Sequence, residues 1–537
     1  MLVAAVAPAC AGDDAPEPAA SALPAVPPAN PYLADSEYPV SHHNPAQQDS
    51  TMLEGPTGPT RTLTDRDFDW QFLGPGHFGS VISGAYPDGR RVIWSNGGDR
   101  IAKLDAETFE VLATYPLPGK EQWTAAQADA ALEALYEAPP ERQPTEAIAL
   151  AARTLVGLAG VYTMIDRDGN LYLSDATGLT LYGDADPTDP ASEIVVRARW
   201  DMPASVSGAL VGMNMTYDGW IILVTEHGDV LAVSRDLATV HTTRMAHSET
   251  AADYTAAAEA AGRTGYGWVR NSYAIDDEGG IYIVSNDYMH RVVWTGDALS
   301  TDAADGAWAE PYRNETGLGS GATPALMGFG DDEDHLVVLT DGDTVMNVTA
   351  FWRDEIPDDW QQVDGAPSRR IAGFARADMG DPERAAIQTE QATVVAGYGA
   401  LVVNNEPASV PPGYPEGRAR SLLAGYLGND ERFTPHGMQK FAWDPAGRTL
   451  SEAWTNPDVA SPNSVPFVSL GTGVVYTVGA RGGDWTLEAV DWDTGEPAFH
   501  YVLPGDAYNS LFAGVTLDQD GNIVYGTPFG KMRIRRV

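Results

Sequence analysis

The stretch Val515-Thr516-Leu517-Asp518-Gln519-Asp520-Gly521-Asn522-Ile523-Val524-Tyr525 holds two short runs of strand-forming residues around an Asp-Gly turn. Asp-Gly between such runs is a strong short-range signal for a β-hairpin. A second copy runs from Tyr162 to Leu173, with its turn at Asp168-Gly169-Asn170. Two hairpins with one pattern at distant positions indicate a repeated β unit.

The pattern recurs along most of the chain. Clear copies have turns near Asp88, Asp218 and Asp277, and weaker copies centre on 332–339, 397–403 and 471–478. The turns recur about every 62 residues, against ~40–50 for common propeller repeats, so each unit must carry loops. We therefore predict an all-β protein, a β-propeller whose four-stranded blades pack against their neighbours.

We count eight blades, and seven is the alternative because the middle copies are the weakest. The last copy has three strands, so a fourth must come from elsewhere, and residues 60–72 are the expected donor because their pairing would remove exposed edges. A helical insertion is expected near 121–153, where 125–135 is rich in Ala, Glu and Leu, and a second helical patch at 249–261. We treat residues 38–537 as a single propeller domain.

Composition narrows the range of partners. The 537 residues include 75 acidic and 33 basic side chains, giving a net charge of −42, while 43% of residues are hydrophobic. Such a polyanion cannot supply the phosphate neutralisation that dominates nucleic-acid binding, so we expect no nucleic-acid partner. We expect a monomer that binds a small molecule or a glycan.

The N-terminus indicates export. Cys10, the only cysteine, follows the apolar residues 1–9, and this end resembles a bacterial lipoprotein signal whose cysteine becomes lipidated. Residues 11–37 are rich in Ala and Pro and read as a linker. We expect a periplasmic or cell-surface lipoprotein that meets the membrane only through this anchor; the alternative is a cytosolic chain with an apolar start.

The strand pairs Asp166–Tyr172 and Asp276–Tyr282 resemble those of two propeller groups. One is the SMP-30/gluconolactonase and strictosidine-synthase-like group, and the other is the quinoprotein alcohol dehydrogenase-like group. The resemblance covers residues from about 60 to 537. It specifies architecture and no close named family.

The first resemblance implies calcium in the central channel, held by Glu and Asn or Asp side chains at the starts of inner strands. The matching residues here are Asn214, Asn271, Glu390 and Asn463. Calcium takes oxygen ligands and can polarise a lactone or ester carbonyl. The alternative is that these asparagines cap turns and satisfy backbone groups.

The second resemblance implies the quinone cofactor PQQ. Those dehydrogenases are similar in having eight blades and many tryptophans, and this chain has 14. Many of them hold the cofactor against a disulfide of adjacent cysteines, which a single cysteine cannot form. We therefore expect calcium rather than PQQ.

The histidines supply the remaining candidates, because histidine most easily serves as a base at neutral pH. His77 begins the first inner strand and should face the channel mouth, so His77 and Glu390 are the expected catalytic residues. The candidate binding residues are His42, His43, His227 and His436. Each could instead be a hydrogen-bonded loop residue.

Three functions remain open at this point. The first is a calcium-assisted hydrolase of lactone or ester type. The second is a non-catalytic propeller that binds a small molecule, glycan or protein. The third is a quinone-dependent oxidoreductase, and the fold alone does not choose among them.

Overall fold

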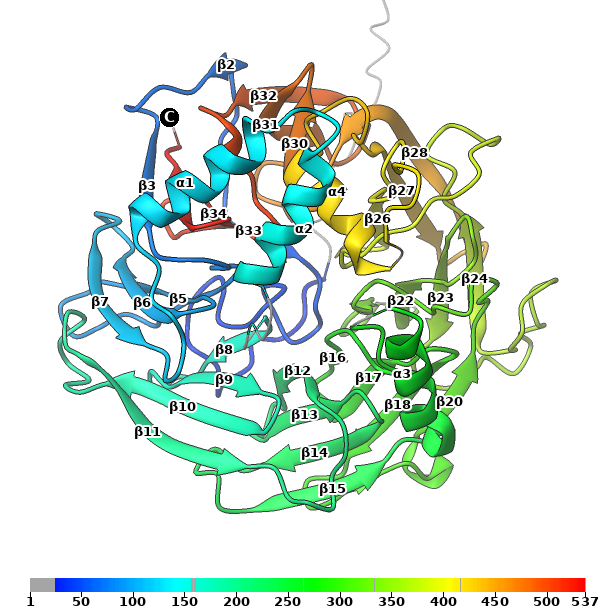
Figure 1. The fold of residues 1–537 in the computed structure, drawn as a ribbon. Helices are drawn as coiled ribbons and strands as arrows, with labels where there is room; N and C mark the ends of the chain where they lie inside the picture. The colour runs from blue at the N-terminus through cyan, green and yellow to red at the C-terminus, as the bar shows by residue number, and fades with distance from the viewer. Residues whose placement is uncertain are drawn as a thin grey trace, which may run out of the picture.

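The computed structural model describes residues 25–155, 158, 161–263, 265–332, 334–415 and 417–536. Over these residues the strands form eight separate sheets, which stand around a central axis as the blades of a propeller (Figure 1). The predicted all-β propeller class is confirmed. The predicted signal remnant 1–10, with the lipidation candidate Cys10, lies outside the described residues.

We number the blades 1 to 8 from the one that begins with β4, and in each blade the strands run from the axis outward. The strands of blades 1 and 2 are β4 (Gly79–Ile82), β5 (Val92–Asn96), β6 (Arg100–Asp105), β7 (Val111–Pro116), β8 (Thr163–Ile165), β9 (Leu171–Asp175), β10 (Gly178–Asp184) and β11 (Ile194–Asp201). Those of blades 3 and 4 are β12 (Leu210–Met215), β13 (Ile221–Thr225), β14 (Asp229–Val233), β15 (Val240–Arg244), β16 (Ala274–Ile275), β17 (Gly280–Val284), β18 (Tyr288–Trp294), β19 (Leu299–Ser300) and β20 (Trp308–Pro311).

Blades 5 and 6 contain β21 (Ala325–Met327), β22 (Leu336–Thr340), β23 (Asn347–Trp352), β24 (Ile371–Arg376), β25 (Val394–Ala396), β26 (Gly399–Val403), β27 (His436–Asp444) and β28 (Thr449–Ala460). Blade 7 contains β29 (Phe467–Ser469), β30 (Val474–Arg481), β31 (Asp484–Asp491) and β32 (Pro497–Val502), and gains β1 (Ser50–Thr51) and β2 (Arg61–Thr62) at its two edges. Blade 8 contains β33 (Val515–Leu517), β34 (Ile523–Thr527), β35 (Gly530–Ile534) and β3 (Phe68–Phe72).

Aspartate side chains hold the turns of the inner hairpins. The Asp166 carboxylate accepts the backbone N–H groups of Asp168 (3.0 Å) and Asn170 (2.9 Å) and the Tyr172 hydroxyl (2.8 Å). Gly169 takes φ +73°, a conformation that glycine adopts without strain. Equivalent turn bonds are made by Asp276 and Asp518. The repeated Asp-Gly pattern therefore marks the turns of β-hairpins, as the sequence predicts.

The ring is closed between early and late parts of the chain. Strand β3 pairs antiparallel with β35, so that Phe68 lies opposite Ile534 and Phe72 opposite Gly530. Asp69 of β3 accepts from the Arg533 guanidinium at 2.6 Å. This pairing supplies the fourth strand of blade 8.

In the described part of the chain, four α-helices lie on one face of the ring (Figure 1): α1 (Ala125–Tyr136), α2 (Gln143–Thr154), α3 (Ala251–Ala260) and α4 (Arg418–Leu427). Helices α1 and α2 confirm the predicted insertion, and α1 begins with a capping box between Thr124 and Gln127. Helix α4 was not predicted, and it packs with α1 and α2, where the Tyr136 hydroxyl donates to the carbonyl of Tyr426 at 3.1 Å. Within the described residues, every helix is too short or too polar to cross a membrane.

Residues 38–51, which we call the channel segment, lie in the centre of the ring (Figure 1). All of its residues are buried except Asn44, which is half-buried. It is hydrogen-bonded to the innermost strand of each of the eight blades. The bonds are Ile82 N to Tyr38 O, Ile165 N to Pro39 O, Asn214 Nδ2 and Ile275 N to Pro45 O, Leu326 N to Ala46 O, Val395 N to Gln48 O, Val468 N to Asp49 O, and Thr516 Oγ1 with His43 Nε2.

The described end of the predicted linker also packs on the propeller. Leu33 is 4% exposed and forms a β-bridge with Asp166. The Asn30 amide donates to the carbonyls of Met215 (3.0 Å) and Thr216 (3.2 Å). Because Asp166 and Thr216 belong to inner hairpin turns, residues 30–33 lie on the face opposite the helices.

Candidate functional site

Two of the three asparagines predicted as calcium ligands, Asn214 and Asn271, hydrogen-bond to backbone groups. The Asn214 amide donates to the carbonyls of Pro45 and Tyr273, both at 2.9 Å, and its oxygen accepts the N–H of Met215. Asn271 donates to two carbonyls of the loop that leads into blade 5, those of Ser320 (3.2 Å) and Ala322 (3.1 Å). These bonds tie adjacent blades and the channel segment together.

Glu390 forms an ion pair with an arginine of the same chain. Its carboxylate lies 3.2 Å from the guanidinium of Arg270, whose side chain is buried and stacks over the Tyr266 ring. The next residue, Gln391, donates to the carbonyl of Asn463 at 3.2 Å. Asn271, Glu390 and Asn463 thus lie on neighbouring loops of the helical face, whereas Asn214 lies within β12.

Asn463 is the exception among the four. It is 2% exposed, and neither atom of its side-chain amide has a hydrogen-bond partner among the described residues. Over the part of the chain that is described, no three or more His, Cys, Asp or Glu side chains form a group suited to a metal ion. The arrangement is one of separate polar contacts rather than a shared set of converging oxygens.

The predicted acid–base residue His77 is fully buried. Its Nδ1 lies 3.0 Å from the Ser95 hydroxyl, and its Nε2 has no partner among the described residues. Burial, and then the charge of Lys531, holds the pKa of His77 well below its ordinary value. The His77 imidazole is therefore neutral at pH 7 and shielded from solvent.

The histidines predicted to bind a ligand all have partners within the chain, and those of His42, His43 and His227 are side chains. His42 Nδ1 lies 2.8 Å and His43 Nδ1 3.5 Å from the Asp49 carboxylate, all within the channel segment. His227 Nδ1 lies 3.2 Å from the Ser207 hydroxyl. His436 lines a cavity.

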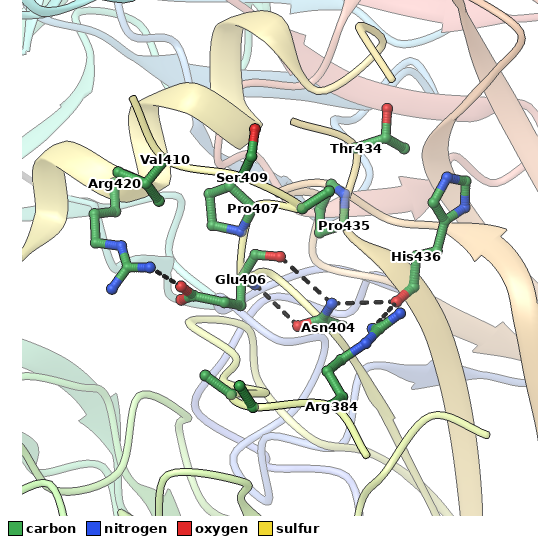
Figure 2. Close-up of a pocket in the computed structure, with 13 residues that line it drawn as sticks. Arg384, Asn404, Glu406, Pro407, Ser409, Val410, Arg420, Thr434, Pro435 and His436 are labelled. Atoms are coloured by element: carbon green, nitrogen blue, oxygen red, sulfur yellow. Dashed lines mark hydrogen bonds and ion pairs between the residues drawn. The ribbon is translucent and has the colours of Figure 1, made fainter. Parts of the chain in front are cut away.

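That cavity has a volume of about 490 Å³ and lies on the helical face of blade 6 (Figure 2). It is formed by the loop from β24 to β25 and by the long connection from β26 to β27, which contains α4. The apolar part of its wall consists of Ala385, Ala386, Pro407, Ala408, Val410 and Pro435. Its size falls within the range of small-molecule sites, ~300–1,000 Å³.

Four titratable side chains line the cavity. Arg420 forms an ion pair with Glu406, and Figure 2 shows this pair on one side and Arg384 and His436 on the other. Burial raises the pKa of Glu406, although the Arg420 guanidinium opposes the shift. Arg384 Nη1 donates to the carbonyl of His436 at 2.7 Å, which fixes this arginine across the cavity floor.

The imidazole of His436 has a defined tautomer. Its Nδ1 lies 3.0 Å from the carbonyl oxygen of Asp458, which only accepts, so Nδ1 carries the proton. Its Nε2 lies 3.6 Å from the Glu431 carboxylate. The two hydroxyls of the wall donate to backbone carbonyls, Ser409 to Arg432 and Thr434 to Asp430, and are not paired with a base.

Sequence reasoning found one residue of this site and missed three. His436 stood out beside Pro435 and Gly437, but Arg384, Glu406 and Arg420 belong to loops without a repeating pattern. The one available signal was the length of the connection from Val403 to His436, because long loops on a rigid scaffold often carry function.

Comparison with solved structures supports the assignment of the fold. No family model matches the chain. The quinohemoprotein alcohol dehydrogenase ADHIIG of Pseudomonas putida HK5 has a TM-score of 0.51 at 12% identity, with 93% of this chain and 80% of that chain covered. The corresponding enzyme of Comamonas testosteroni has a TM-score of 0.50 at 12% identity, covering 93% and 77%. The resemblance to quinoprotein-like propellers is therefore confirmed as a likeness of fold.

A protein related in sequence identifies the family. An uncharacterized protein of Archaeoglobus fulgidus is 31% identical over 525 residues, which cover 95% of this chain and 89% of the relative. The chain belongs to the same family as this archaeal protein.

Proposed function

We propose that the protein is a non-catalytic propeller that binds a small organic molecule in the cavity of blade 6. The observation that carries this proposal is the cavity itself, in which an apolar wall surrounds a few charged groups. Binding sites for small molecules are typically concave and mostly apolar, with a small number of placed polar groups. The loops that form it project from a rigid ring.

The position of the channel segment supports this choice over the calcium-assisted hydrolase. The expected calcium site lies on the axis, and the channel segment occupies the axis at the level of Asn214. Arg270 provides the positive charge beside Glu390. The hydroxyls of Ser409 and Thr434 are bonded to carbonyls, so the cavity presents no activated nucleophile among its described residues.

A small molecule fits the cavity better than a glycan. A sugar buries many hydroxyl groups, and each one left without a hydrogen-bond partner costs free energy. The alanine, proline and valine side chains of the wall offer no such partners. An aliphatic body with one polar end matches both parts of the lining.

Filling the cavity with a larger side chain is expected to weaken ligand binding. Ala386 lines it and is half-buried, so in Ala386→Phe the ring would occupy the space of the ligand. We expect at least one of hexanoate, hexylamine and 1-hexanol to bind the wild type in calorimetric or saturation-transfer NMR titrations. Affinity for that probe should fall about tenfold or more, equivalent to about 1.4 kcal/mol, in the variant.

The matched control is Ala126→Phe, which makes the same change at an exposed position of α1. It should leave binding unchanged. Equal binding by the wild type and Ala386→Phe would contradict the assignment of the cavity as the site.

A further inference from the structure

The charged side chains that line the cavity are mostly positive, whereas the protein as a whole is strongly negative. The chain carries 75 acidic and 33 basic residues, a net charge of −42. The charged side chains of the cavity lining are nevertheless two arginines, Arg384 and Arg420, against one carboxylate, that of Glu406. The lining therefore has a net positive charge inside a strongly negative molecule.

Both guanidinium groups keep hydrogen-bond donors available. Arg420 Nη2 bonds Glu406, while its buried Nε has no partner among the described residues. Arg384 Nη1 bonds the carbonyl of His436, and its Nε lies 3.9 Å from the half-exposed carboxylate of Asp381. Since a guanidinium carries five N–H donors, most donors of the pair are not committed by these contacts.

We propose that the ligand is a small aliphatic carboxylate, whose carboxylate group binds Arg420 and whose hydrocarbon chain packs on Ala386 and Val410, with Arg384 adding positive charge from the other side of the cavity. This inference rests on the proposed function of the cavity. Arginine is suited to such a ligand because its planar fork donates two parallel bonds to a carboxylate. The apolar wall accounts for the hydrocarbon chain, because removing it from water is favourable.

Glu406 acts against such a ligand. Its carboxylate occupies one side of Arg420 and places a negative charge beside the incoming carboxylate. Like charges in a partly buried site repel each other more strongly than in water. Removing the charge of Glu406 should therefore strengthen the binding of a carboxylate, whereas it would weaken the binding of an amine that used Glu406 as its partner.

The test compares three probes of equal chain length, hexanoate, 1-hexanol and hexylamine, by calorimetric titration of the full-length protein. We expect hexanoate to bind most tightly. Arg420→Met should weaken hexanoate about tenfold while changing 1-hexanol by less than about twofold, since the alcohol does not need the charge. The retained binding of 1-hexanol shows that this variant is folded.

Two further variants complete the test. Glu406→Gln should increase the affinity for hexanoate several-fold. Arg66→Met, at an exposed position outside the cavity, should leave the affinity for each probe unchanged. Tightest binding of hexylamine, or hexanoate binding that is insensitive to Arg420→Met, would overturn the inference while leaving the binding function in place. Binding of none of the three probes would overturn the proposed function and this inference with it.

Discussion

Asp49→Asn is expected to lower the free energy of unfolding by about 3 kcal/mol, because it removes the charge at the centre of a buried cluster. The Asp49 side chain is 2% exposed and lies 2.8 Å from His42 Nδ1 and 3.5 Å from His43 Nδ1. All three residues have positive φ, of +51°, +65° and +71°, in a region that most residues avoid. Their mutual contacts hold the channel segment in this conformation.

The effect of pH on this cluster has a definite sign. Burial alone would raise the pKa of Asp49, but His42 and His43 outweigh it, and the pKa lies below its ordinary value. The carboxylate therefore contributes stability above about pH 4, its range in an unfolded chain, and loses it as the pH falls further. The difference between the wild type and Asp49→Asn should shrink below about pH 4.

Urea unfolding followed by tryptophan fluorescence measures both effects. Asparagine is chosen because it tolerates positive φ better than other residues, so the result reports the lost charge rather than backbone strain. The control is Asp35→Asn, the same change at an exposed position of the same N-terminal region. A stability equal to that of the wild type would show that the cluster does not hold the channel segment.

Replacing either of two buried lysines with methionine is expected to change the free energy of unfolding, but in opposite directions. Lys531 is 0% exposed, and its amine has no hydrogen-bond partner among the described residues. Lys103 is also 0% exposed, but its amine forms an ion pair with Asp184 and donates to the carbonyl of Ser192 at 2.7 Å. Lys531→Met should stabilise the protein by about 3 kcal/mol at pH 7, and Lys103→Met should destabilise it by about as much.

The cause of the first effect is desolvation. Burial lowers the pKa of Lys531 to about 7 from its ordinary value of 10.5. Each unit of pKa difference between the folded and unfolded states corresponds to about 1.4 kcal/mol. Between pH 7 and 10.5 the unfolded chain binds more protons at this residue, so wild-type stability should rise with pH over that interval.

Denaturant titrations at pH 7, 8.5 and 10 distinguish these cases. The advantage of Lys531→Met should be largest at pH 7 and shrink towards pH 10, while Lys103→Met remains less stable than the wild type. Destabilisation by Lys531→Met at pH 7 would mean that its amine has a partner that the structure does not contain.

The propeller could be predicted from sequence because its signals are local. The seven residues from Asp166 to Tyr172 contain the turn acceptor, the glycine at positive φ and the start of the strand that follows. Hairpins of this kind repeat, and a repeat of sheets with buried faces indicates a closed ring. Helices α1 and α2 were likewise signalled by local composition.

The channel segment and the cavity could not be predicted, because their contacts join distant parts of the chain. Residues 38–51 bind most of the blades through backbone groups on both sides, which leave no mark on residue identity. Glu406 meets Arg420 through a loop and a helix, and Arg384 reaches them from a separate loop. The asparagines had the residue type of metal ligands, but the local pattern does not show whether a carbonyl such as Pro45 O is within reach.

The most direct test of the central claim is the location of ligand binding in solution. Alanine and valine methyl groups labelled with ¹³C can be followed by NMR while the tightest-binding of the three six-carbon probes is added. The account predicts that chemical-shift changes centre on Ala385, Ala386, Ala408 and Val410, and that Ala46 in the channel segment is unaffected. Changes centred on Ala46 and the inner strands, with the cavity methyl groups unmoved, would contradict it.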